Sequence, residues 1–207
     1  DDSERLVEFK GGVPSPDVRA LLQGTTHMLV SIPPDLEGDI TLRHHRDDIA
    51  ALPDLTWIGY LSTVGVYGDW HGEWVDETCP TRPISERSLR RAQAERAWLD
   101  FARETGRRVE VFRLAGIYGP GRSVIDNLRA GTARRIVKPG QVFNRIHVDD
   151  VARVLAAAID KPGGHSIFNV SDDEPAPPEQ VVAYAAEMLG LPPPPEVPFD
   201  KAGLTGM

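Results

Sequence analysis

Short apolar runs alternate along the chain with longer stretches of helical periodicity. The apolar runs predict strands at residues 6–9, 27–32, 57–62, 109–114, 135–138, 142–147 and 166–170. Apolar residues at helical spacing predict helices at residues 15–24, 39–52, 85–105, 123–130, 151–159 and 178–189, and glycine ends four of these segments, at positions 24, 106, 131 and 190. This alternation is typical of an α/β fold whose parallel strands are joined by right-handed crossovers.

The stretch at residues 57–68, WIGYLSTVGVYG, carries the first indication of function. Its apolar part predicts a strand covered on both faces, and the run ends in Ser62 and Thr63. Ligands of α/β proteins bind at the carboxyl ends of such strands, but serine and threonine also cap turns. The pattern therefore leaves two interpretations open, a functional hydroxyl and a turn cap.

Three segments lack clear periodicity. Residues 64–83 are too long for an ordinary connection, which predicts a functional loop. Residues 115–121 are a glycine-rich turn, and the proline-rich residues 191–199 predict an extended connector. The region after about residue 121 is less regular than the region before it.

Composition narrows the classes of function. The 207 residues carry a net charge of −8, which argues against a nucleic-acid-binding face, although local arginine clusters leave an anionic small molecule open. Cys79 is the single cysteine, so an internal disulfide is excluded and a reducing, cytoplasmic location is expected. The longest candidate membrane span, residues 151–159, is interrupted by Arg153, so no membrane association is expected.

Three stretches together resemble one enzyme superfamily. They are LSTVGVYGD at residues 61–69, FRLAGIYGPG at residues 112–121 and RIHVDDVA at residues 145–152. Their order and separation are similar to those of the extended short-chain dehydrogenase/reductase superfamily, the NAD-dependent epimerase/dehydratase group. The resemblance extends from Val30 to Gly190.

The resemblance implies an incomplete Rossmann-like parallel sheet flanked by helices, with a small C-terminal substrate lobe. Residues 1–120 would be the remainder of an NAD(P)-binding domain whose first strands and helices are absent. Residues 121–207 would form the lobe region, interleaved with the last Rossmann elements. By the same resemblance, the helices at residues 39–52 and 85–105 would pair with a second copy in a homodimer.

The resemblance also implies roles for individual residues around a small-molecule substrate and NAD or NADP. The expected catalytic residues are Thr63, Ser62 and Tyr118. The expected cofactor-binding residues are Ser31, Ile32, Leu61, Arg91, Leu114, Ala115, Gly116 and Ile117, and the expected substrate-binding residues are Arg87, Arg145 and His147. His147 also has an ordinary interpretation as a satisfied histidine at a strand end. No metal is expected, and the pair His44-His45 with Asp47-Asp48 predicts a solvated helix surface.

Two departures from the family pattern affect the expected chemistry. No G-x-x-G-x-x-G loop occurs in the sequence to seat a pyrophosphate, which places cofactor binding by this chain in doubt. Counting back from Glu95 puts Arg87 and Arg91 at the family's acid/base tyrosine and lysine positions. A guanidinium is always protonated near neutral pH, so Arg87 cannot serve as a general base.

Two hypotheses follow. The first is an atypical NAD(P)-dependent oxidoreductase or epimerase that acts on a sugar nucleotide or another small carbonyl or hydroxyl compound. The second is a non-catalytic NAD(P)-binding sensor or scaffold module, in which the two arginines hold phosphate or ribose.

Overall fold

A four-stranded parallel sheet forms the centre of the protein. The computed structural model describes residues 5–9, 11–161 and 166–203. The strands β1 (His27–Val30), β2 (Trp57–Thr63), β3 (Val109–Leu114) and β7 (Ile167–Val170) lie in the order β1-β2-β3-β7. All neighbouring strands are parallel. The predicted α/β class with a parallel sheet flanked by helices is therefore confirmed.

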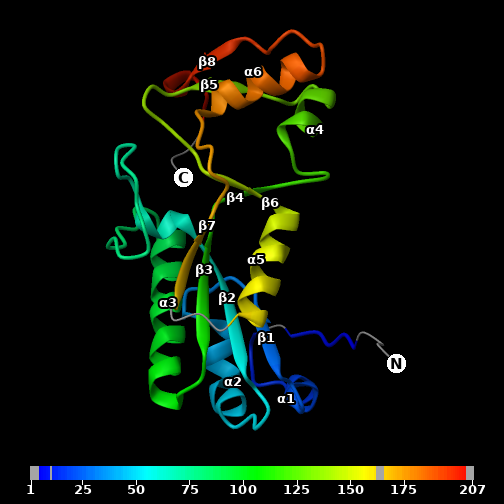
Figure 1. Ribbon diagram of the computed structural model, residues 1–207, viewed down its shortest axis with the longest axis vertical. Coiled ribbons are helices and arrows are strands. Elements are labelled where there is room, and N and C mark those ends of the chain that lie inside the picture. Colours follow the sequence, from blue (N-terminus) through cyan, green and yellow to red (C-terminus); the bar gives the residue numbers. More distant parts are fainter. Residues whose placement is uncertain (1–4, 10, 162–165, 204–207) are drawn as a thin grey trace.

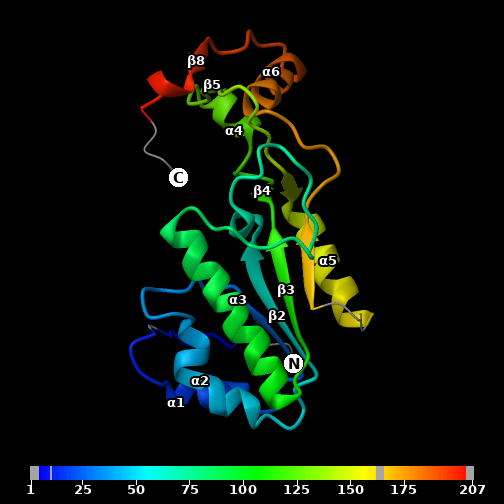
Figure 2. The ribbon, with the colours of Figure 1, turned by 90° about the vertical axis from the view of Figure 1, so that its left-hand side faces the viewer.

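Helices cover both faces of the sheet (Figures 1 and 2). One face carries α2 (Ile40–Ala50) and the long α3 (Glu86–Thr105), with the short α1 (Pro16–Leu22) beside α2, and the other face carries α5 (Val148–Asp160). The side chains of Ser15, Asp39 and Ser85 cap α1, α2 and α3, and each accepts a backbone N–H from the first turn of its helix.

Strand alternation divides the core into two apolar clusters. On the α2–α3 side, Ile58, Tyr60 and Val111 pack with helix residues that include Trp98 and Phe101. On the α5 side the buried residues are Trp57, Phe112, Leu114, Ala115, Ile146, Val151 and Val170. Successive residues of β2 therefore point to opposite layers.

A smaller lobe lies beyond the carboxyl ends of the sheet strands (Figure 1). It contains α4 (Val124–Arg129), β5 (Arg135–Val137), α6 (Pro178–Met188), β8 (Glu196–Pro198) and the 3-10 helix η2 (Phe199–Lys201). A separate apolar cluster around Leu128, Val182 and Ala186 holds α4 against α6. The parallel pair β4 (Gly116–Tyr118) and β6 (Arg145–His147) connects the lobe with the sheet.

Several predicted elements differ in the structure. Residues 6–9 form no strand, because no described strand pairs with them, and Leu6 is 90% exposed. The glycine-rich turn at 115–121 contains β4, and the connector at 191–199 contains β8, which pairs with β5. The strand predicted at 142–147 is limited to β6, and α5 begins three residues early because the His147 ring caps it.

The prediction of a solvated surface at residues 44–48 is wrong for His45. Its side chain is buried, with Nε2 accepting the Ser15 N–H at 3.3 Å and Nδ1 lying 3.0 Å from the Asp48 carboxylate. His45 has non-helical φ and ψ within α2, and this local distortion accompanies the inward position of its ring. The ring therefore attaches α1 to α2.

Candidate functional site

The carboxyl ends of all four sheet strands meet at one edge, below the small lobe. The strands end there at Val30, Thr63, Leu114 and Val170, and β4 starts two residues after β3 ends. Ligands of open α/β sheets bind outside this edge. The described chain thus brings the expected catalytic and cofactor-binding segments to the carboxyl ends of the strands.

Thr63 lies at the end of β2 and caps the 3-10 helix η1 (Val64–Tyr67). Its Oγ1 accepts the backbone N–H of Gly65 at 3.1 Å. A hydroxyl can accept and donate at the same time, and among the described residues no acceptor for the Thr63 proton is present. The turn cap and the functional hydroxyl, which the sequence left as alternatives, are therefore compatible.

Ser62 points to the opposite layer and is 7% exposed. Its hydroxyl donates to the Glu95 carboxylate on α3, and Glu95 also forms a buried ion pair with Arg113 on β3, with an Nη2–Oε2 distance of 2.8 Å. Sequence reasoning used Glu95 only to align the helix and assigned Arg113 no role. A charged residue at an inward position of a buried strand was the available indication for Arg113.

Arg91, at the expected lysine position, turns toward the sheet. Its Nη1 donates to the Tyr60 hydroxyl and to the Leu61 carbonyl oxygen, both at 3.0 Å. Burial, opposed by the charge of Arg91, raises the pKa of Tyr60 to about 12. Arg87, at the expected tyrosine position, is exposed and has no ion-pair or hydrogen-bond partner within the described ranges.

Tyr118 and His147 face each other across β4 and β6. Their ring centroids are 5.2 Å apart with an interplanar angle of 76°, and Tyr118 is 38% exposed. His147 Nδ1 accepts the Asp149 N–H at 3.2 Å, so the neutral ring carries its proton on Nε2. On the same strand, Arg145 donates through Nη1 to the carbonyl oxygens of Phe143 and Ala176.

The remaining expected cofactor-binding residues lie at the same edge and differ in how exposed they are. Ser31 and Ile32 follow β1 and are exposed, Leu61 and Ile117 are half-buried, and Gly116 is exposed at the start of β4. Leu114 and Ala115 are buried beneath them. No glycine-rich loop occurs in this sequence to fit the pyrophosphate.

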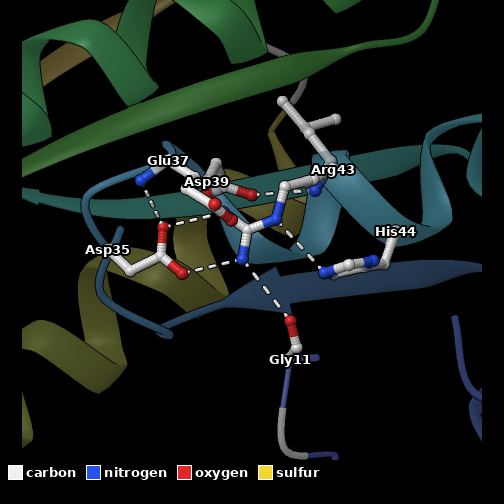
Figure 3. A network of polar contacts seen from close by, with 7 residues as sticks. Gly11, Asp35, Glu37, Asp39, Arg43 and His44 are labelled. Atoms are coloured by element: carbon white, nitrogen blue, oxygen red, sulfur yellow. Dashed lines mark hydrogen bonds and ion pairs between the residues drawn. The ribbon is translucent and has the colours of Figure 1, made fainter. Parts of the chain in front are cut away.

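The loop at residues 33–39, which follows Ser31 and Ile32, is fixed by one arginine (Figure 3). Arg43 forms two hydrogen bonds with the Asp35 carboxylate at 2.8 and 2.7 Å, and it also lies 3.2 Å from Glu37 and 3.4 Å from the Gly11 carbonyl oxygen. The hydrogen bond from Arg43 is the main cause that lowers the pKa of Asp35 to about 2. The loop at residues 33–39 is therefore held in place by charge-assisted hydrogen bonds.

Two surface hollows lie on α3 and in the lobe. One, of about 440 Å³, runs along α3 and reaches Glu95 and Arg113, and the other, of about 520 Å³, lies between α6 and Arg135 in the lobe. Within the described part of the chain, no group of three or more His, Cys, Asp or Glu side chains is arranged to hold a metal ion. No helix in the described ranges is long and apolar enough to cross a membrane.

Comparisons with known proteins agree with the fold and the expected family. Protein YeeZ of Escherichia coli is 34% identical over 137 residues, which are 65% of this chain and 47% of that protein. A solved structure, that of a functionally unknown conserved protein from Silicibacter pomeroyi DSS, has 50% sequence identity with this chain. The two structures superpose over 96% of this chain and 68% of that chain, with a TM-score of 0.86.

A more distant solved structure shares the fold. The dTDP-glucose 4,6-dehydratase of Bacillus anthracis in complex with NAD is 18% identical, covers 87% of this chain and 64% of its own, and has a TM-score of 0.75. The chain spans about half the length of Protein YeeZ. Residues 54–171 match the family model described as NAD dependent epimerase/dehydratase family. The family prediction is confirmed, and the chain belongs to the NAD-dependent epimerase/dehydratase family.

Proposed function

We propose that the protein containing this chain is an NAD(P)-dependent oxidoreductase or epimerase that acts on a sugar nucleotide or another small carbonyl or hydroxyl compound. The observation that carries the proposal is the Thr63 hydroxyl, which is held by the Gly65 N–H and retains a proton to donate at the ligand edge of the sheet. Family membership and the NAD complex of a protein with the same fold support the choice of cofactor.

In this proposal, different residues at the edge orient the substrate and exchange its proton. A bound NAD(P) would accept or return the hydride. Thr63 would donate a hydrogen bond to the reacting oxygen of the substrate, and the exposed Tyr118 hydroxyl or the Nε2–H of His147 would exchange the proton. Arg87 is exposed and unpaired among the described residues, so it is available to bind a phosphate group of a sugar nucleotide.

Substitution of Thr63 tests this function directly. In the whole protein, Thr63→Val should lower hydride transfer about 100-fold, because the donor to the reacting oxygen is lost. The measurement is the absorbance of reduced nicotinamide, with NADH and NADPH offered against a panel of sugar nucleotides and small carbonyl compounds. Thr63→Ser is the matched control, since serine keeps both the cap and the donor and should retain activity.

Unchanged turnover in an active Thr63→Val protein would remove Thr63 from the mechanism. Melting curves of both variants separate this effect from loss of the η1 cap, since valine also abolishes the hydrogen bond to Gly65.

A second function is favoured by the two arginines of α3. Neither guanidinium can exchange a proton near neutral pH, and Arg91 is committed to Tyr60 and Leu61. These positions suit a sensor or scaffold that binds NAD(P) without hydride chemistry. Titration of the whole protein with NADH and NADPH separates the two functions: binding without turnover on the panel favours the sensor, and absence of binding contradicts both.

The cytoplasmic location expected from the sequence belongs to the same proposal. Its support is Cys79, the single cysteine, which is unpaired in the structure. Cell fractionation that recovers the protein outside the cytoplasm would contradict it.

A further inference from the structure

A continuous chain of polar side chains runs beneath the candidate site. It joins β2, α3, β3, η1 and β7 through Ser62, Glu95, Arg113, Tyr67 and Asn169. We call these five residues the buried network. These five elements are thus tied to one another by side chains that lie far apart in the sequence.

The centre of the buried network is the ion pair between Glu95 and Arg113. Arg113 donates from Nη2 and Nε to the carboxylate, at 2.8 and 3.2 Å for Oε2, and the two residues are only 3% and 4% exposed. The Ser62 hydroxyl donates to the other carboxylate oxygen. A buried ion pair is tolerated only when its remaining donors and acceptors are also paired, so each member depends on the next.

The Tyr67 hydroxyl joins this ion pair to the long loop at residues 68–83. It accepts from Arg113 Nη1 at 2.7 Å and lies 2.8 Å from Asn169 Oδ1 and 3.0 Å from the Asp76 carbonyl oxygen. The loop is attached a second time, since Glu77 accepts the backbone N–H of Asn169 at 2.6 Å. Removal of one oxygen atom from Tyr67 would therefore loosen the loop from the edge of the sheet.

The buried network engages one of the two adjacent hydroxyls at the end of β2. Consecutive residues of a strand point to opposite faces, so Ser62 committed to Glu95 on the α3 side leaves Thr63 on the α5 side. We infer that the buried network is a positioning device, which orients the Ser62-Thr63 end of β2 and fixes residues 68–83 beside the candidate site. Its effect on turnover rests on the proposed function, whereas its effect on the loop does not.

Proteolysis of the loop tests the inference without any assumption about activity. Trp74, which is 78% exposed, is the exposed chymotrypsin site in the loop, whereas Trp70 is half-buried. Tyr67→Phe should raise the rate of cleavage after Trp74 roughly tenfold or more, because the hydroxyl that joins charged Arg113 to the loop is lost. The matched control is Tyr184→Phe, which removes an exposed hydroxyl in the lobe and should cleave at the wild-type rate.

A wild-type cleavage rate in Tyr67→Phe would overturn the inference. If Tyr67→Phe fails to fold, Asn169→Ala, which removes a half-buried partner of Tyr67, takes its place in the same assay with the same expected result.

Kinetics of the whole protein then separate positioning from catalysis. Ser62→Ala should lower kcat about tenfold with KM nearly unchanged, and Ser62→Thr, which keeps the donor to Glu95, should restore it. Equal kcat in wild type and Ser62→Ala would overturn the positioning role of Ser62. A wild-type protein without turnover would contradict the proposed function, while the cleavage rates would still decide whether the buried network holds the loop.

Discussion

The buried Tyr60 hydroxyl accepts a hydrogen bond from Arg91 of α3. Its pKa of about 12 lies above the usual 10.0, and burial is the main cause. The folded state therefore favours the neutral phenol, and this contribution to stability is complete below pH 10.0 and is lost as the pH rises through about 12. We predict that alkaline titration followed by phenolate absorbance shows a late step that belongs to Tyr60.

Tyr60→Phe should remove the late step of that titration. If the late step persists in the variant, the assignment to Tyr60 is wrong. The same substitution leaves Arg91 with the Leu61 carbonyl oxygen as its remaining described hydrogen-bond acceptor, so the variant also reports how firmly Arg91 holds the end of β2.

Single residues also show why the site was only partly predictable. The sequence indicated that Ser62 and Thr63 reach the edge of the sheet, and strand alternation separates their directions. It did not indicate which one is committed to the fold, because that depends on Glu95, which lies 33 positions further along the chain. The contact of Arg91 with Tyr60, 31 positions apart, was hidden in the same way.

The loop at residues 68–83 starts with a conformation that only glycine adopts easily. Gly68 has a φ of 75°, and a Cβ there would lie 2.0 Å from the Arg82 carbonyl oxygen. Gly68→Ala should therefore lower the free energy of unfolding by about 2 kcal/mol or more, from backbone strain together with overpacking. Thermal or denaturant unfolding provides the measurement.

Gly72→Ala is the matched control in the same loop. Gly72 has a φ of 86°, but a Cβ there would meet no atom within 4 Å, so only the backbone strain of about 1 kcal/mol applies. Equal loss of stability in the two variants would show that the contact with Arg82 has no energetic weight.

Elements were predicted well where their signals are local. Capping residues and apolar periodicity located α1, α2 and α3, since a helix forms its hydrogen bonds within one segment. The three-residue strands β4 and β8 were missed because each exists only through its partner, β6 or β5. The strand predicted at residues 6–9 failed for the converse reason, since no described strand pairs with it.

The net charge of the protein is −8, but arginines make several of the contacts that join its elements. Arginines link the elements around the sheet edge: Arg43 holds the loop after β1, Arg91 the end of β2 and Arg113 the buried network. These guanidinium groups are paired within the fold, whereas Arg87 is exposed and has no hydrogen-bond or ion-pair partner among the described residues, so it is available to an anionic ligand.

We propose that α2 and α3 form the interface of a homodimer. Both helices lie on one face of the sheet (Figure 2), and the hollow of about 440 Å³ along α3 presents Arg96 and Asp100 together. A two-fold axis brings the same patch of both copies together, so an arginine of one copy can meet the aspartate of the other. Light scattering of the whole protein over a range of concentrations should give the mass of a dimer.

Ala92 lines that hollow and is half-buried, which makes Ala92→Arg the sharpest test of the interface. The added guanidinium should convert the dimer to a monomer with little change in melting temperature, because the side chain can extend into solvent once the copies separate. Ala183→Arg, at a half-buried position that lines the hollow of the lobe, is the matched control and should remain dimeric. A wild-type protein that stays monomeric at the highest concentration contradicts the proposal, and dissociation of both variants would place the interface elsewhere.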